Sequence, residues 1–243
     1  MRRNKLFFGI LISLFFAVET ALGILLQCSS GRAVSVFSFL SVVLACLFCL
    51  LFMARTKAYL LTQAALVFTV VADYFLVLSN PQIKLPAMLA FLVTQLCYGV
   101  RIFLTDENEG RKRVEALVRI VLSFGIVIAT AAVLGRDCDL LAPVSMLYYL
   151  HLLLNVVFAF LRFKRNAVLA FGLLLFILCD TLIGLAMLEG YFPVNSDLIE
   201  SIVHPGFDLA WAFYLPAQML LAVSLLPAFK GSCKNKERAR DEL

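Results

Sequence analysis

Residues 166–188 read NAVLAFGLLLFILCDTLIGLAML, an apolar segment interrupted by a single charged residue, Asp180. A helix needs roughly 20 mostly apolar residues to cross a bilayer, so this segment is long enough to span one. The whole chain has the same character, because 63% of its 243 residues are hydrophobic and only 15% are charged. Soluble domains carry about 25% charged residues. The sequence therefore predicts an all-α polytopic membrane protein and excludes a disordered chain, a disulfide-stapled secreted fold and an outer-membrane barrel.

Eight apolar runs follow one another along the chain, separated by polar breaks too short to form a water-soluble domain. We therefore expect a single integral membrane domain over residues 1–243, folded as a transmembrane helical bundle of eight spans. The spans are predicted near 6–27, 34–53, 58–78, 85–104, 114–134, 140–161, 166–188 and 206–229.

Basic residues show which ends of these spans face the cytoplasm. Most of the 21 lysines and arginines lie at the amino end, in the second, fourth and sixth breaks, and in the tail 230–243. Because basic loops stay on the cytoplasmic side, both termini should be cytoplasmic, with 230–243 as a basic cytoplasmic tail. The net charge of +5 then reflects topology, and no nucleic-acid partner is expected. Arg101 and Arg119 lie near predicted inner helix ends and are expected to snorkel toward the head groups.

Three acids lie inside predicted spans, where a carboxylate costs at least a few kcal/mol and usually marks a functional site. Asp73 lies 16 residues beyond Lys57, and Asp180 lies 15 beyond Arg165. At 1.5 Å per residue both lie about 22–24 Å from the cytoplasmic side of a core of ~30 Å. Glu19 falls at about the same level, although a structural role would also account for it. We therefore predict a functional layer centred on Asp73 and Asp180.

Polar residues at helical spacing accompany these acids, and they are candidates for binding or orienting a substrate. They are Gln95 with Tyr98, Tyr214 with Gln218, and His151 with Asn155. An acid followed by glutamine and tyrosine on the next helix occurs in both halves of the chain, which suggests a 4+4 parallel pseudo-repeat. For His151 and Asn155, hydrogen bonding between helices is an equally good interpretation.

The available chemistry is that of carboxyl groups. The chain has two histidines, no HExxH and no GxSxG, so a three-histidine zinc site is excluded, and neither a metal nor a cofactor is expected. Two close carboxyls in an apolar environment hold one proton between them. One can then donate a proton while the other stabilises an oxocarbenium-like cation or activates water. The matched depth of Asp73 and Asp180 therefore favours acid catalysis by these two residues.

Two stretches carry a resemblance to a known family. Residues 68–103, with FTVVADYFLVL and the following helix, and residues 173–224, with LLLFILCDTLIGL and YLPAQML, resemble the two signatures of the YhhN family. The resemblance implies a membrane hydrolase of the lysoplasmalogenase type, which cleaves the vinyl-ether bond of a lysophospholipid-like substrate. The products would be a fatty aldehyde and a glycerophospho-base. It assigns the acid and base roles to Asp73 and Asp180 without deciding which residue has which role.

The chain also departs from the family pattern. Ala72 stands in place of a glycine, Cys179 of a serine and Gln95 of a histidine, and the span 34–53 lacks a lysine. A divergent member is therefore expected, in the plasma membrane if the source is bacterial, and no oligomeric state is predicted. Two alternatives stay open: a proton-coupled small-molecule transporter that uses the same acids, and a catalytically silent family member.

Overall fold

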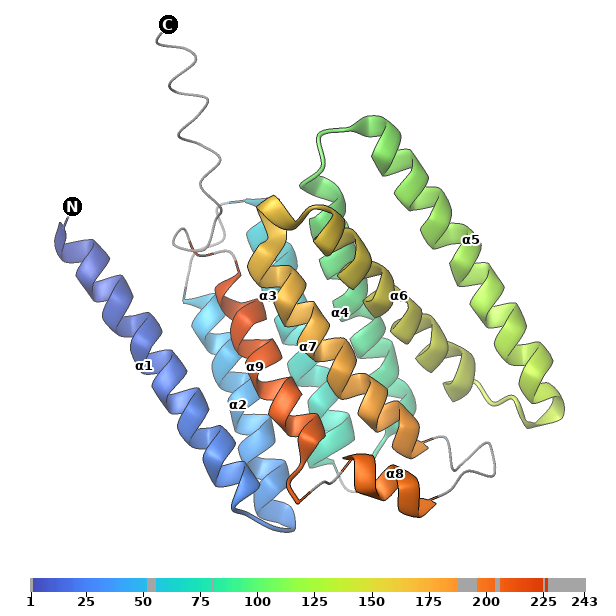
Figure 1. The fold of residues 1–243 in the computed structure, drawn as a ribbon, viewed down its shortest axis with the longest axis horizontal. Coiled ribbons are helices and arrows are strands. Elements are labelled where there is room, and N and C mark those ends of the chain that lie inside the picture. The colour runs from blue at the N-terminus through green and yellow to red at the C-terminus, as the bar shows by residue number, and fades with distance from the viewer. Residues whose placement is uncertain are drawn as a thin grey trace, which may run out of the picture.

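The computed structural model describes residues 2–51, 56–79, 81–187, 196–203, 206–224 and 226, and within them the chain forms helices and no strands. The all-α prediction is thus confirmed. In chain order the elements (Figure 1) are α1 (Arg2–Gln27), α2 (Arg32–Leu50), α3 (Lys57–Asp73), η1 (Tyr74–Leu78), α4 (Lys84–Leu104), α5 (Glu109–Leu134), η2 (Gly135–Asp137), α6 (Leu141–Leu161), α7 (Phe163–Met187), α8 (Ser196–Val203) and α9 (Leu209–Val223).

Seven helices in the described part of the chain are long and apolar enough to cross a membrane. They are α1, α2, α3 continued by η1, α4, α5, α6 and α7. The eighth predicted range, 206–229, holds α9, which has 15 described residues, while the predicted tail 230–243 lies outside the described residues. Helix α8 lies in the polar break between the last two predicted spans.

Local signals at the helix ends explain several boundaries. The chain turns between α1 and α2 at Gly31, which has a φ of 60° that side chains other than glycine rarely adopt. Helix α5 begins where the side chain of Asn108 accepts a hydrogen bond from the backbone N–H of Arg111 at 3.0 Å. Asp208 caps α9 in the same way, through the N–H of Trp211 at 3.2 Å.

The helices form a bundle with two peripheral members. Helices α1 and α5 stand at opposite edges, and α2, α3, α4, α6, α7 and α9 lie between them (Figure 1). Helix α5 packs on α6 and turns large apolar side chains outward, such as Phe124 at 69% and Ile128 at 67% exposure. A face of this kind suits contact with lipid. The amino end of α1 and the carboxyl end of α9 lie at the same end of the bundle.

Of the two arginines expected to snorkel, Arg101 contradicts the prediction, whereas Arg119 is partly exposed and has partners within the protein. Arg119 pairs with Glu115 at 2.9 Å, and its guanidinium also donates to Asn155 at 2.9 Å. Glu115 is itself paired with Arg162 at 2.7 Å, which ties α5 to the end of α6. Arg101 turns into the bundle and is only 2% exposed. Partners on α3 and at the end of α9 therefore hold Arg101, while Arg119 is held by Glu115 of its own helix and by Asn155 of α6.

Candidate active site

Asp73 occupies an unusual position at the end of α3. It is the last α-helical residue before the π-helical turn η1, and its side chain is 2% exposed. Turns of this kind are rare and occur often at functional sites. The hydroxyl of Tyr214, on α9, donates a hydrogen bond to Oδ2 of Asp73 at 2.7 Å. A residue 141 positions further along the chain thus orients this carboxyl group.

Asp180 lies in the second half of α7 and has a phenol partner of its own. The hydroxyl of Tyr148, on α6, donates a hydrogen bond to Oδ2 of Asp180. Asp180 is half-buried, whereas Tyr148 is buried. Each predicted aspartate therefore has one carboxyl oxygen held by a tyrosine from another helix. Asp73, Tyr214, Asp180 and Tyr148 are called the carboxyl–phenol site below.

The two halves of the carboxyl–phenol site belong to one electrostatic cluster. Asp73 interacts electrostatically with Asp180, and Tyr214 and Tyr148 each interact with both aspartates. The buried thiol of Cys179 also interacts with both. The structure thus brings together the two acids that the sequence singled out, along with Tyr214 from the candidate binding residues.

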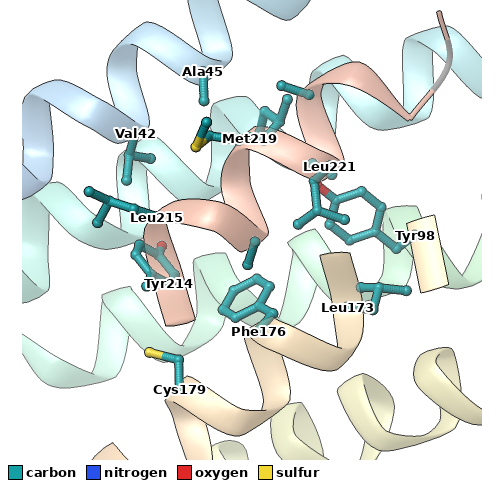
Figure 2. Close-up of a cluster of buried hydrophobic side chains, with 14 of the residues drawn as sticks. Val42, Ala45, Tyr98, Leu173, Phe176, Cys179, Tyr214, Leu215, Met219 and Leu221 are labelled. Carbon is teal, nitrogen blue, oxygen red and sulfur yellow. The ribbon is translucent and has the colours of Figure 1, made fainter. Parts of the chain in front are cut away.

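Aromatic rings connect the two tyrosines. The ring of Tyr148 stacks on Phe91 with centroids 5.5 Å apart, and Phe91 meets Phe176 edge-on at 6.0 Å. Phe176 in turn contacts Tyr214 edge-on at 5.4 Å, and Figure 2 shows these two rings beside each other, with Cys179 further along α7. These four rings form an aromatic row from one carboxyl–phenol pair to the other. The faces of aromatic rings attract cations, so this aromatic row suits a positively charged intermediate.

The remaining candidates lie in other contacts. The side-chain amide of Asn155 donates to the backbone oxygen of Gln95 at 2.7 Å and to its side-chain oxygen at 3.1 Å. His151 shares a hydrogen bond of 3.2 Å with Ser123 of α5. These contacts link α4, α5 and α6 to one another, which agrees with the structural interpretation of His151 and Asn155 rather than with contact to the acids.

Glu19, Tyr98 and Gln218 complete the predicted set. The carboxyl of Glu19 accepts a hydrogen bond from Ser41, which joins α1 to α2. The hydroxyl of Tyr98 and both polar side-chain atoms of Gln218 are buried, and none has a hydrogen-bond partner among the described residues. If the two halves of the chain were strictly equivalent, Tyr98 would hydrogen-bond Asp180 as Tyr214 hydrogen-bonds Asp73. Tyr98 makes no such bond among the described residues.

Sequence reasoning missed Tyr148, although a signal was present. Tyr148 lies three residues before His151, so the two share a helix face. Extending the His151–Asn155 face by one turn would have included it. No group of three or more histidine, cysteine, aspartate or glutamate side chains in the described part of the chain could hold a metal ion.

Comparison with known families decides the family. The model of the YhhN family matches residues 33–225, most of the chain. The protein belongs to the YhhN family. The YhhN match includes the whole carboxyl–phenol site and leaves out α1, the helix that carries Glu19. No match was found among curated proteins or among solved structures. The multiple apolar helices of the protein are compatible with a multi-pass membrane protein.

Proposed function

We propose that the protein is a membrane hydrolase of the lysoplasmalogenase type, which cleaves the vinyl-ether bond of a lysophospholipid. Membership of the YhhN family supports this class of activity. The observation that carries the proposal is the carboxyl–phenol site, in which two membrane-embedded aspartates interact with each other and each is oriented by a tyrosine. Placing two acids inside the membrane costs free energy, and a role in acid–base catalysis accounts for their presence there.

The reaction needs a proton donor, a stabilised cation and a water molecule. One carboxyl group protonates the outer carbon of the vinyl double bond, which leaves an oxocarbenium ion. The other, as a carboxylate, faces this cation and accepts a proton from the water that adds to it. The resulting hemiacetal breaks its bond to the glycerol oxygen, which takes the proton held by the second carboxyl, while the hemiacetal hydroxyl gives its proton to the first and the fatty aldehyde is released. One water is consumed, and both carboxyl groups return to their starting state.

The surroundings of the two acids support this sequence of steps. Tyr214 and Tyr148 hold one oxygen of each carboxyl, so the other oxygen can face the substrate. The aromatic row between them offers ring faces to the oxocarbenium ion. We place the acid and base roles on Asp73 and Asp180 jointly, because each has the same kind of partner.

The topology that we propose has eight spans and cytoplasmic termini, within a single membrane domain over residues 1–243. In this arrangement α9 begins the eighth span, and residues 230–243 form the basic tail. A bacterial source would place the protein in the plasma membrane. Accessibility of a tag fused after Leu243 tests this topology: labelling from outside intact cells would refute it.

Conversion of each acid to its amide tests the activity. We expect Asp73→Asn and Asp180→Asn each to lower aldehyde release from a lysoplasmalogen by about 10²–10⁴-fold, the contribution typical of general acid–base catalysis. Asp137→Asn is the matched control, because Asp137 is exposed at the end of η2. Thermal unfolding of every variant should stay close to that of the unmodified protein, to show that folding persists.

Two outcomes would overturn the assignment. Full activity in either amide variant would remove that aspartate from the mechanism. Flux of a small molecule across proteoliposomes without bond cleavage would favour the transporter instead. Transporters commonly break their helices near the midplane, whereas α9 continues as a helix through Pro216. That continuity supports the hydrolase.

A further inference from the structure

Arg101 is a buried cation that the proposed reaction does not use. Its side chain projects from α4 between α3 and α9, and the residue is 2% exposed. The Nη1 atom donates to the hydroxyl oxygens of Thr62 at 2.9 Å and Ser224 at 2.7 Å, and Nη2 donates to the backbone oxygen of Ser224 at 3.3 Å. The Nε atom has no hydrogen-bond partner in the described part of the chain.

All recorded hydrogen-bond acceptors of this guanidinium are uncharged. Among the described residues no carboxylate forms an ion pair with Arg101, whereas Arg119 has one such partner and Arg162 has two. The hydroxyl groups of Thr62 and Ser224 have hydrogen-bond acceptors of their own. Thr62 donates to the backbone oxygen of Ala58 at 2.9 Å, and Ser224 to that of Leu221 at 2.7 Å. Buried charges are normally paired, so this one is positioned for an anion that the described part of the chain does not supply.

The free edge of the guanidinium has the geometry for a phosphate. Both donors on Nη1 and one donor on Nη2 are used, which leaves Nε and the second donor of Nη2 for a ligand. Arginine binds phosphate oxygens in a bidentate manner through such an edge. Tyr98 interacts electrostatically with Arg101, and its hydroxyl is buried without a hydrogen-bond partner among the described residues. It can therefore supply a further donor.

Unpartnered polar groups also lie between Arg101 and the carboxyl–phenol site. Gln218 stands one helical turn after Tyr214 on α9, toward Ser224, and neither of its polar side-chain atoms has a partner among the described residues. On α4, the amide nitrogen of Gln95 lacks one too. Buried polar groups without partners are costly in an apolar environment. A polar ligand between the two sites would satisfy them.

We propose that Arg101 and Tyr98 form a binding site for a phosphate group, with Thr62 and Ser224 holding the guanidinium in place. The source that we favour is the head-group phosphate of the lipid substrate, and this part rests on the proposed function. Free phosphate has the same recognition chemistry and is separated from the lipid by the experiment below.

The spacing of the two sites suits a glycerophospholipid. Tyr214 of α9 and Ser224, the residue that caps the end of this helix, are ten residues apart, which corresponds to about 15 Å along the helix axis. Five bonds separate the vinyl-ether oxygen from the phosphorus, about 6 Å at ~1.5 Å per bond in a zigzag chain. Hydrogen bonds of ~3 Å at each end bring the reach to about 12 Å, which agrees with the helical spacing to within one turn.

Binding of a ligand that cannot be cleaved tests the site independently of catalysis. The probes are a saturated 1-O-alkyl lysophosphocholine, the uncharged 1-O-alkylglycerol with the same chain, and inorganic phosphate, each added to the full-length protein in detergent. We expect the lysophosphocholine to bind at least tenfold more tightly than the alkylglycerol, because charge-assisted bonds to phosphate are the stronger kind. The saturated ether has no vinyl bond to cleave, so failure of the hydrolase proposal leaves this test intact.

Arg101→Met is the decisive variant, because it replaces the cation with an apolar side chain of similar length. We expect its thermal stability without ligand to match or exceed that of the unmodified protein, and its preference for the lysophosphocholine to disappear. Replacing a buried charge by an apolar residue is often neutral or stabilising. Arg136→Met is the matched control at an exposed position and should retain the preference.

Tyr98→Phe guards against a folding defect in Arg101→Met. It removes only the unpartnered hydroxyl, and we expect severalfold weaker binding of the lysophosphocholine with no loss of thermal stability. Binding of inorganic phosphate that Arg101→Met abolishes would support the phosphate site with the free anion as its ligand. Equal binding of lysophosphocholine and alkylglycerol, without any binding of inorganic phosphate, would overturn the proposal. Unchanged lysophosphocholine binding in both Arg101→Met and Tyr98→Phe would do the same.

Discussion

Replacement of Glu115 by glutamine should destabilise the protein more than any comparable change on α5. The side chain of Glu115 is 0% exposed and pairs with Arg119 at 2.9 Å and Arg162 at 2.7 Å. Removing one partner of a buried ion pair typically costs about 3–5 kcal/mol, because the remaining charge is left uncompensated. Arg162 keeps Asp106 as a partner at 2.8 Å, so the lower end of that range, about 3 kcal/mol, is expected.

The matched control lies on the same helix. Glu109 pairs with Lys112 at 2.7 Å, but its side chain is 72% exposed. Exposed pairs of this kind contribute roughly 0.2–1 kcal/mol, so Glu109→Gln should have little effect. For a chain of this size 1 kcal/mol corresponds to roughly 2–4 °C in melting temperature. Glu115→Gln should therefore lower it by about 6–12 °C and Glu109→Gln by no more than about 4 °C.

Thermal unfolding in detergent, followed by the fluorescence of the single tryptophan Trp211, measures both shifts. A double variant tests the cause of the loss. Glu115→Gln combined with Arg119→Gln should lose less than the sum of the two single variants, because the unpaired charge is removed together with its partner. Equal shifts for Glu115→Gln and Glu109→Gln, or strict additivity in the double variant, would refute the reasoning.

Two further predictions concern packing and pH. A Cβ at Gly172 would lie 3.0 Å from side-chain atoms of Leu221, so Gly172→Ala should lower the stability of the protein by about 1–3 kcal/mol because α7 would be overpacked against α9. Gly184 has open space around it, so Gly184→Ala should be neutral in the same unfolding assay. Asp106 lies outside the spans, and the backbone N–H of Asn108, aided by Arg162, lowers its pKa below the usual value. A carboxyl with a lowered pKa stabilises the fold above about pH 4, and this stabilisation is lost in more acidic solution. Asp106→Asn should therefore unfold at a lower temperature than the unmodified protein at pH 7, and the difference in melting temperature should shrink near pH 3. An equal difference at both pH values would contradict this.

The bundle and its acids could be predicted because their signals are local in the sequence. Apolar runs of about 20 residues identify the helices that could span a bilayer, and Asp73 and Asp180 stand out because each interrupts such a run. Tyr214 was predicted as well, since it lies on the same helix face as Gln218. These inferences need only the cost of polar groups in lipid and the helical period.

The rest of the candidate site depends on how helices turn toward one another. Tyr148 and Tyr149 are adjacent and chemically identical, yet the first bonds Asp180 and the second Thr181. Only the rotation of α6 against α7 separates their roles. Arg101 was expected at the membrane surface because it lies near a helix end. Its inward direction depends on partners from two other helices, which no local pattern reveals.

The hydrogen bond between Tyr214 and Asp73 has a consequence for biosynthesis. Its two partners are 141 residues apart, so at 5–20 residues per second Tyr214 is synthesised roughly 7–28 s after Asp73. During that interval the third helix can enter the bilayer with a carboxyl that lacks its final partner. The carboxyl–phenol site is therefore completed only by α9, the last helix in the described part of the chain. A nascent protein has no finished carboxyl–phenol site until Tyr214 has been synthesised, and a chain truncated before α9 would carry an aspartate in lipid without its tyrosine partner.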